Sequence, residues 1–282
     1  RDLHSFPTRR SSDLWQTTTE ETLRVVVDAP LARAMAEQAS GFSAHYPATS
    51  IDVVPERSGK TLLSLLRRQS GAVIVNGNLT AQEDSLLRQF RRPGRKEPVA
   101  RDAIICIVNR QSPLDTITVQ RLSALLSGKN QTGTGLRAWT SRNDFRLLAT
   151  LRMVLDGDGK ELYAMQCDSD SMLFRQVASD PSALGLLYLS SYRTLALSET
   201  EKKRVRMLQV ASNATGSRAV PVSEQYLFDG RYPLGTPVYY IYVPGTPLAA
   251  GFGSWLSRNG QKTFERNYLA PIRQVPRTII LK

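Results

Sequence analysis

Four short polar segments follow predicted strands and precede predicted helices, and their residue types suit anion binding. They lie at residues 28–30, 56–60, 76–78 and 141–144. The start of a helix offers unpaired N–H groups and the positive end of the helix dipole, which attract a small oxyanion. In an open parallel sheet, ligands bind beyond the carboxyl ends of the strands. If two lobes direct such segments into one cleft, the sequence predicts an anion-binding clamp.

Two cations stand close to these turns, Lys60 and Arg142. Arg142 is the stronger candidate, because a guanidinium group binds an oxyanion through two parallel donors. Lys60 is explained at least as well as a solvated side chain. Asp28 and Asp144 are explained as helix caps, and the separation of Asp144 from the aspartates near residue 170 is open.

The sequence SGKT at residues 58–61 lies between a predicted strand and a predicted helix, as in a nucleotide-binding P-loop. That motif requires glycine five residues before Gly59, where this chain has Val54. Glu56 would also place a carboxylate where phosphates should bind. Nucleotide binding is therefore a disfavoured alternative, and Ser58 and Gly59 are expected to meet one anionic group instead.

The composition excludes several function classes. The net charge is +12, but the basic residues are scattered and aromatic residues make up only 7%, so we expect a basic surface and no nucleic-acid partner. The 2 histidines in the chain exclude most metal sites and most nucleophiles that a histidine base would assist. The longest apolar run, residues 103–108, is too short to span a bilayer.

Strands and helices alternate along the chain. The β-branched runs at 23–27, 50–54 and 71–77 are each followed by a helical pattern. A long strand is predicted at 99–109 and a last strand at 278–281. This alternation predicts an α/β fold with a mainly parallel sheet.

Four segments together resemble the phosphate-binding proteins of ABC transporters, which belong to the periplasmic-binding-protein-like group. They are VARDAIICIVNRQSPLDTITVQRLSALLSGK (99–129), SDPSALGLLYLSSY (179–192), GRYPLGTPVYYIY (230–242) and FGSWLSRNGQKTFERNYLAPI (252–272). The matches run in family order and cover nearly all of the chain after Trp15. The resemblance implies two lobes joined by crossing hinge strands that close on a ligand.

The resemblance also implies which positions bind the oxyanion. They are Asp28, Ala29, Ser58, Gly59, Lys60, Asn76, Gly77, Ser141, Arg142 and Asn143. The third turn reads VNGNLT where the family carries Ser-Asp or Arg. The middle-lobe turn reads SRNDFRLL where the family carries Arg-Ser-x-Gly-Ser-Gly-Thr, so the identity of the oxyanion stays open.

We therefore expect an extracytoplasmic solute-binding protein that captures phosphate or another small oxyanion for an ABC transporter permease. The resemblance implies no catalysis, so we expect no catalytic residues, no enzyme activity, no metal site and no cofactor. The protein is expected to be a monomer, periplasmic or lipid-anchored, with lobe I at 15–104 plus 190–282 and lobe II at 105–189. The alternative within the same fold is a sensor or scaffold with a drifted ligand site.

The first fourteen residues, RDLHSFPTRRSSDL, match the translation of a common sequencing adapter. They are excluded from fold reasoning and predicted to be disordered and unpacked, with Phe6 exposed. The absence of a signal peptide or lipid-anchor cysteine is then no evidence for a cytoplasmic protein.

Overall fold

The apolar runs recognised in the sequence form the central strands of a computed structural model, which describes residues 21–90, 93–128, 135–155, 161–213 and 217–273. Among these residues, ten strands join in one sheet whose main path runs β2-β1-β3-β11-β4-β8-β6-β7. The predicted leader 1–14 and a predicted last strand at 278–281 lie outside the described residues.

The first lobe holds one end of this sheet. Its strands are β1 (Glu21–Asp28), β2 (Thr49–Glu56), β3 (Ala72–Asn76), β11 (Gly235–Tyr242) and β12 (Ala270–Pro271). Its helices are η2 (Ala29–Leu31), α1 (Ala32–His45), α2 (Ser58–Leu66), α3 (Ala81–Arg88), α10 (Pro247–Ser257) and α11 (Gln261–Arg266). Strands β1, β2 and β3 are parallel, and β11 runs antiparallel to β3.

The second lobe holds the other end. Its strands are β5 (Thr116–Thr118), β6 (Arg137–Ser141), β7 (Met165–Cys167), β8 (Ala183–Tyr188), β9 (Val205–Met207) and β10 (Gln209–Ala211). Its helices are α4 (Val119–Leu126), α5 (Leu147–Val154), α6 (Asp170–Ser179), α7 (Leu189–Thr194), α8 (Glu199–Lys202) and α9 (Glu224–Phe228). Strands β6, β7 and β8 are parallel, so the expected α/β class with mainly parallel sheets is confirmed.

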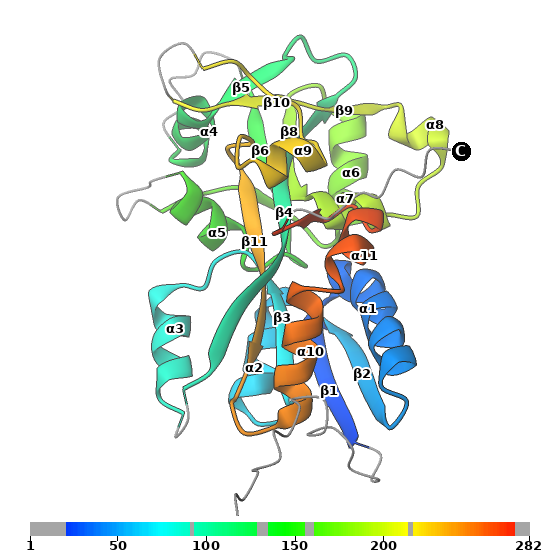
Figure 1. The fold of residues 1–282 in the computed structure, drawn as a ribbon. Coiled ribbons are helices and arrows are strands. Elements are labelled where there is room, and N and C mark those ends of the chain that lie inside the picture. Colours follow the sequence, from blue (N-terminus) through cyan, green and yellow to red (C-terminus); the bar gives the residue numbers. More distant parts are fainter. Residues whose placement is uncertain (1–20, 91–92, 129–134, 156–160, 214–216, 274–282) are drawn as a thin grey trace, which may run out of the picture.

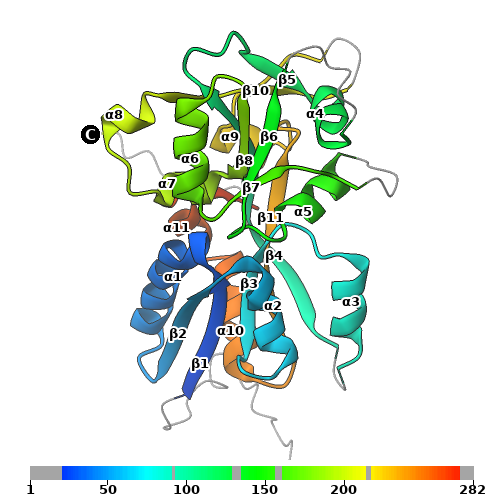
Figure 2. The same ribbon diagram turned by 180° about the vertical axis from the view of Figure 1, so that it is seen from behind.

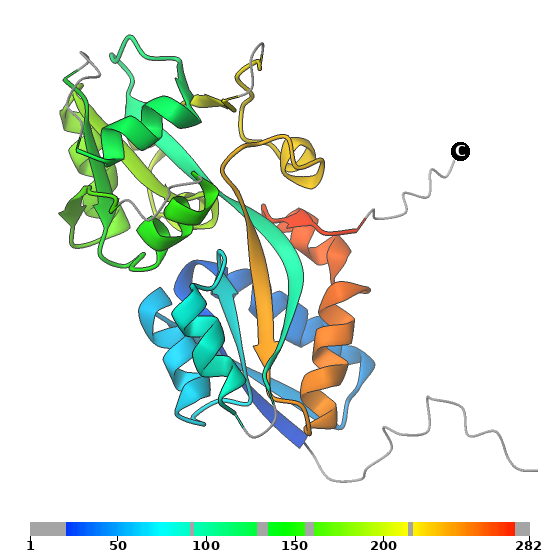
Figure 3. The ribbon, with the colours of Figure 1, turned by 90° about the vertical axis from the view of Figure 1, so that its left-hand side faces the viewer.

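One long strand, β4 (Arg95–Asn109), belongs to both lobes (Figures 1 and 2). Its first half pairs with β11 and its second half pairs with β8 and β9. Figure 3 shows the two lobes one above the other, with β4 and the chain leading into β11 passing between them. These are the crossing strands that the sequence predicts.

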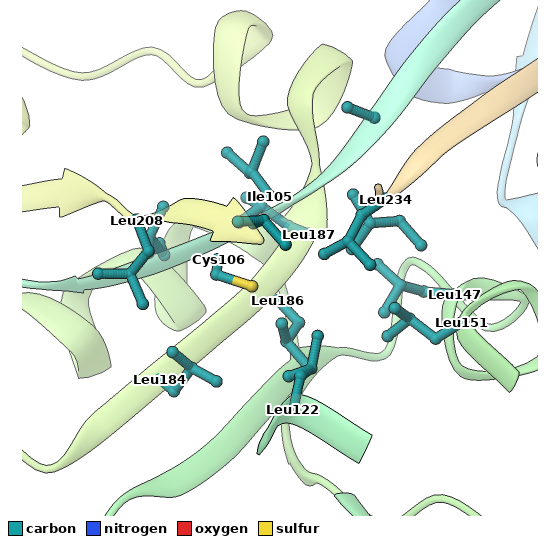
Figure 4. Close-up of a cluster of buried hydrophobic side chains, with 14 of the residues drawn as sticks. Ile105, Cys106, Leu122, Leu147, Leu151, Leu184, Leu186, Leu187, Leu208 and Leu234 are labelled. Atoms are coloured by element: carbon teal, nitrogen blue, oxygen red, sulfur yellow. The ribbon is translucent and has the colours of Figure 1, made fainter. Parts of the chain in front are cut away.

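Separate hydrophobic cores stabilise the lobes. The second-lobe core consists of side chains from the apolar half of β4, from strand β8 and from the inner faces of α4, α5 and α6. Figure 4 shows Cys106 among the leucines of this core. Cys106 and Cys167 are both buried free thiols. Burial of such apolar surface is the main favourable term in folding.

The second lobe extends further along the chain than the predicted boundary at 189/190. Val205, Leu208, Val210, Leu227 and Leu234 all pack in the second-lobe core, whereas the sequence assigned them to the first. The chain returns to the first core only with β11, from Val238 onward. Apolar runs in a sequence do not by themselves reveal which of two cores their side chains join.

Candidate functional site

The predicted polar turns of both lobes meet at the lobe junction. In the first lobe, β1 ends at Asp28, β3 ends at Asn76 and α2 begins at Ser58. In the second lobe, β6 ends at Ser141. The Ser58 hydroxyl donates a hydrogen bond of 3.3 Å to the carbonyl oxygen of Asn143, across the junction. The strand ends of the two lobes therefore face one another, as a two-lobe clamp requires.

Asp28 is a buried carboxylate with one oxygen engaged and one unused. Its Oδ2 accepts a 2.7 Å hydrogen bond from the Asn76 backbone N–H. Its Oδ1 is buried and has no hydrogen-bond partner among the described residues. Burial raises the pKa of Asp28 to about 6, although the Asn76 amide acts in the opposite direction. Near neutral pH this side chain can accept or donate a proton.

A second carboxylate, Asp102, lies where β4 crosses between the lobes and is fully buried. Its Oδ2 accepts hydrogen bonds of 2.5 Å from the Asn76 side-chain amide and from the Ser190 hydroxyl. The Asn76 side-chain oxygen in turn accepts from Thr236 at 3.2 Å. Burial raises the pKa of Asp102, while these donors lower it. This network ties β3, β4, β11 and α7 together at the hinge.

Two further carboxylates, Asp144 and Asp170, lie on the second-lobe side. Burial, and after it the charge of Asp170, raise the pKa of Asp144 well above its usual value. Burial also raises the pKa of Asp170, whose Oδ1 has no hydrogen-bond partner among the described residues. Ser191 donates to Asp144 at 3.5 Å. The carboxylate pair left open by the sequence is thus Asp144 with Asp170.

Arg146 carries positive charge from the second lobe into the first, and only 5% of its side chain is exposed. Its Nη1 donates to the Asn76 carbonyl at 2.9 Å, and its Nη2 donates to the Asn78 carbonyl at 2.7 Å. Its Nε donates to Glu83 Oε1 at 2.9 Å. Glu83 also completes a capping box with Thr80 at the start of α3. Arg146 is therefore a bonded link between the lobes.

The ten sequence-predicted positions divide into two groups. Six lie buried or half-buried at the junction: Asp28, Ser58, Asn76, Gly77, Ser141 and Asn143. Four are exposed: Ala29, Gly59, Lys60 and Arg142. Arg142 pairs at 3.3 Å with Asp168, and both side chains are largely exposed. The cation at the junction is Arg146, one helical turn later in the same SRNDFR segment.

The backbone conformation at position 77 requires a glycine. Its φ is +79°, a left-handed conformation that disfavours a side chain, and a Cβ there would lie 2.4 Å from the Thr150 hydroxyl. The chain can therefore turn sharply after β3 and approach α5 of the other lobe.

Sequence reasoning missed Arg146, Asp102 and the burial of Asp170. Asp102 could have been found from the sequence because it is a charged residue inside an otherwise apolar strand. Arg146 could have been found because it lies about one helical turn after Arg142. Within the described ranges, no group of histidine, cysteine, aspartate or glutamate has the arrangement of a metal site. Nor is any described helix long and apolar enough to cross a membrane.

Comparison with known proteins adds the family context. Residues 15–259 match the family described as PBP superfamily domain. No curated protein is significantly similar in sequence. Among solved structures, one similar protein is described as a phosphate ABC transporter substrate-binding protein from Clostridium perfringens with bound phosphate. It shares 15% identity with a TM-score of 0.68, over 89% of this chain and 100% of that chain.

Two other solved structures show how widely the fold is shared. An ABC-type phosphate transport receptor from Vibrio cholerae has a TM-score of 0.66 at 15% identity, covering 89% of this chain and 99% of that chain. The regulatory domain of a LysR family regulator from N. meningitidis has a TM-score of 0.54 at 13% identity, covering 90% of this chain and 99% of that chain. At these identities the likeness establishes the fold.

Proposed function

Because the chain belongs to the PBP superfamily domain family, we propose that it is a solute-binding protein that captures a small oxyanion, phosphate first, between its lobes. It would act outside the cytoplasm, as a periplasmic or lipid-anchored monomer, and pass the solute to an ABC transporter permease without catalysis. The phosphate-transport proteins among the similar structures support this choice of ligand and partner.

The start of α2 is the observation that carries the proposal. Among the described residues, no side chain caps this helix. The Lys60 N–H donates to the Arg57 carbonyl oxygen at 2.8 Å, so the N–H groups of Ser58 and Gly59 are the ones left for another acceptor. Ser58, the first residue of α2, is only 4% exposed and contacts Asn143 of the other lobe. An uncapped helix start held against the opposite lobe favours a bound oxyanion.

The buried carboxyls fit an anion only if they carry protons. Burial raises the pKa of Asp28, Asp144 and Asp170, so each takes up a proton more readily than an exposed aspartate. A protonated carboxyl has no charge and offers an O–H donor. We expect phosphate binding to strengthen as the pH falls toward 6, the value to which the pKa of Asp28 is raised.

A second candidate is a sensor or scaffold of the same fold that binds no solute at the junction. The bonds from Arg146 to Asn76, Asn78 and Glu83 favour it, because they hold the lobes together without a ligand. The regulatory domain among the similar structures shows that this fold also occurs in regulators.

The decisive test is isothermal titration calorimetry of the full chain with phosphate, sulfate, molybdate and Mg-ATP. We expect saturable binding of phosphate. Ser58→Ala removes the hydroxyl, and Ser58→Pro also removes the N–H donor. Proline is tolerated at the first helical position, and Arg57 before it is already extended (φ −65°, ψ 141°).

Affinity should fall about tenfold in Ser58→Ala and further in Ser58→Pro. Arg142→Ala, which changes an exposed ion pair in the adjacent turn, is the matched control and should bind as the parent does. Binding of Mg-ATP alone would contradict the proposal in favour of a nucleotide-binding protein. No binding of any of these ligands would favour the sensor or scaffold.

A further inference from the structure

A cavity of about 580 Å³ lies beside η2 and α1, and none of the residues that start α2 lines it. Its walls come from α1 and α11 of the first lobe and from α7 of the second. Figures 1 and 2 show these three helices stacked along one side of the molecule. The volume is within the range of small-molecule pockets, and it is far larger than a single inorganic ion needs.

Arginines from three different helices line this cavity: Arg33, Arg193 and Arg266. Among the described lining residues the only carboxylate is Glu37. Glu37 is already engaged, because it accepts 2.8 Å from the Asn267 side-chain amide and lies 3.7 Å from Arg33. Arg193 and Arg266 have no carboxylate partner among the described residues. The cavity therefore has an excess of guanidinium donors, which bind phosphate and carboxylate groups in parallel pairs.

Tyr268 at the rim holds one of these arginines in place. The Arg193 guanidinium lies over its ring, 4.9 Å from the centroid. The backbone of Tyr268 has φ +63°, the left-handed conformation in which a helix normally ends with glycine. A bulky residue is strained there, and such strain is concentrated at functional positions. The ring is 56% exposed, so it holds Arg193 without closing the cavity.

We propose that this cavity is a second binding site, for a small organic molecule that carries at least two phosphate or carboxylate groups. The occupant would contact α1 and α11 on one lobe and α7 on the other, and so would favour the closed arrangement of the lobes. Ser190, which lines the cavity, also donates to Asp102 at the hinge. The proposal holds whether or not the lobe junction binds phosphate.

The test is calorimetric titration of the full chain with citrate, 2,3-bisphosphoglycerate and fructose 1,6-bisphosphate, which carry carboxylate or phosphate groups on different organic frameworks. At least one should bind saturably. The double variant Arg193→Ala/Arg266→Ala should weaken it by about tenfold or more. Arg258→Ala removes one positive charge from an exposed arginine at the end of α10, outside the cavity, and should bind as the parent does.

Tyr268→Gly separates binding from stability. It relieves the backbone strain, so its melting temperature should be equal to or above that of the parent, while affinity for the organic anion should fall. Three results would overturn the proposal: no binding of any of the three probes, undiminished binding in the double variant, or an equal loss in Arg258→Ala. Binding lost in the double variant and weakened in Tyr268→Gly, with inorganic phosphate binding unchanged in both, would support it.

Discussion

Replacing Arg146 with methionine removes the charged link between the lobes and keeps a side chain of similar length. Four hydrogen bonds disappear: two to Glu83 and one to each of the carbonyl oxygens of Asn76 and Asn78. Since Arg146 is 5% exposed and the Glu83 side chain is 22% exposed, solvent replaces these partners poorly. Among the described residues, the Glu83 carboxylate then keeps the hydrogen bond from the Thr80 N–H alone.

The expected cost follows from this burial. Removing one partner of a largely buried ion pair costs about 3–5 kcal/mol, because the other charge is left uncompensated. At about 2–4 °C for each kcal/mol, the melting temperature should fall by roughly 10 °C. Arg142→Ala breaks only the exposed pair with Asp168 and should cost less than about 1 kcal/mol. Two arginines four residues apart thus differ sharply in their expected effect.

Equilibrium unfolding in urea measures both variants, and small-angle X-ray scattering reports whether the lobes separate. Glu83→Gln completes a double-mutant cycle, because glutamine retains an oxygen that can accept from Thr80. A coupling energy of about 1 kcal/mol or more between Arg146 and Glu83 is expected. The description of Arg146 as a link between lobes would be refuted if Arg146→Met behaved like Arg142→Ala in both measurements.

Three further outcomes are expected. Burial raises the pKa of Asp28 from its ordinary value of 3.8 to about 6 in the folded protein. Between these pH values the folded state therefore holds a proton that the unfolded chain has released. The free energy of unfolding should then fall by about 2 kcal/mol as the pH rises from 4 to 6, and this part of a urea-denaturation pH profile should flatten in Asp28→Asn. Gly77→Ala should destabilise by more than about 1 kcal/mol in the same assay, because φ is +79° and Thr150 occupies the space. Burial raises the pKa of Cys106 to about 12, so mass spectrometry after thiol-reagent treatment at pH 8 should find it unmodified in the native protein; native-state labelling would contradict its burial.

The turns that form the candidate site could be predicted from the sequence, because in an α/β fold each turn from a strand into a helix lies at the carboxyl end of that strand. Asp28, Ser58, Asn76 and Ser141 follow from that rule alone, and all are buried at the junction. Arg142 and Lys60 satisfy the same rule but are exposed. Sequence position fixes which turn a residue occupies, whereas the direction of its side chain depends on the packing of the neighbouring lobe.

The sequence by itself determined the α/β class, the long strand that becomes β4 and the polar turns at the strand ends, because these follow from local periodicity and turn chemistry; that β4 crosses between lobes was implied by the family resemblance. Only the tertiary structure decided that Val205, Leu208, Val210, Leu227 and Leu234 pack in the second core and that Arg146 rather than Arg142 enters the junction. It also decided that Asp102 and Asp144 are buried there. These outcomes depend on contacts between residues far apart in the chain. A hydrophobic period shows that a face is buried and leaves undetermined which distant surface covers it.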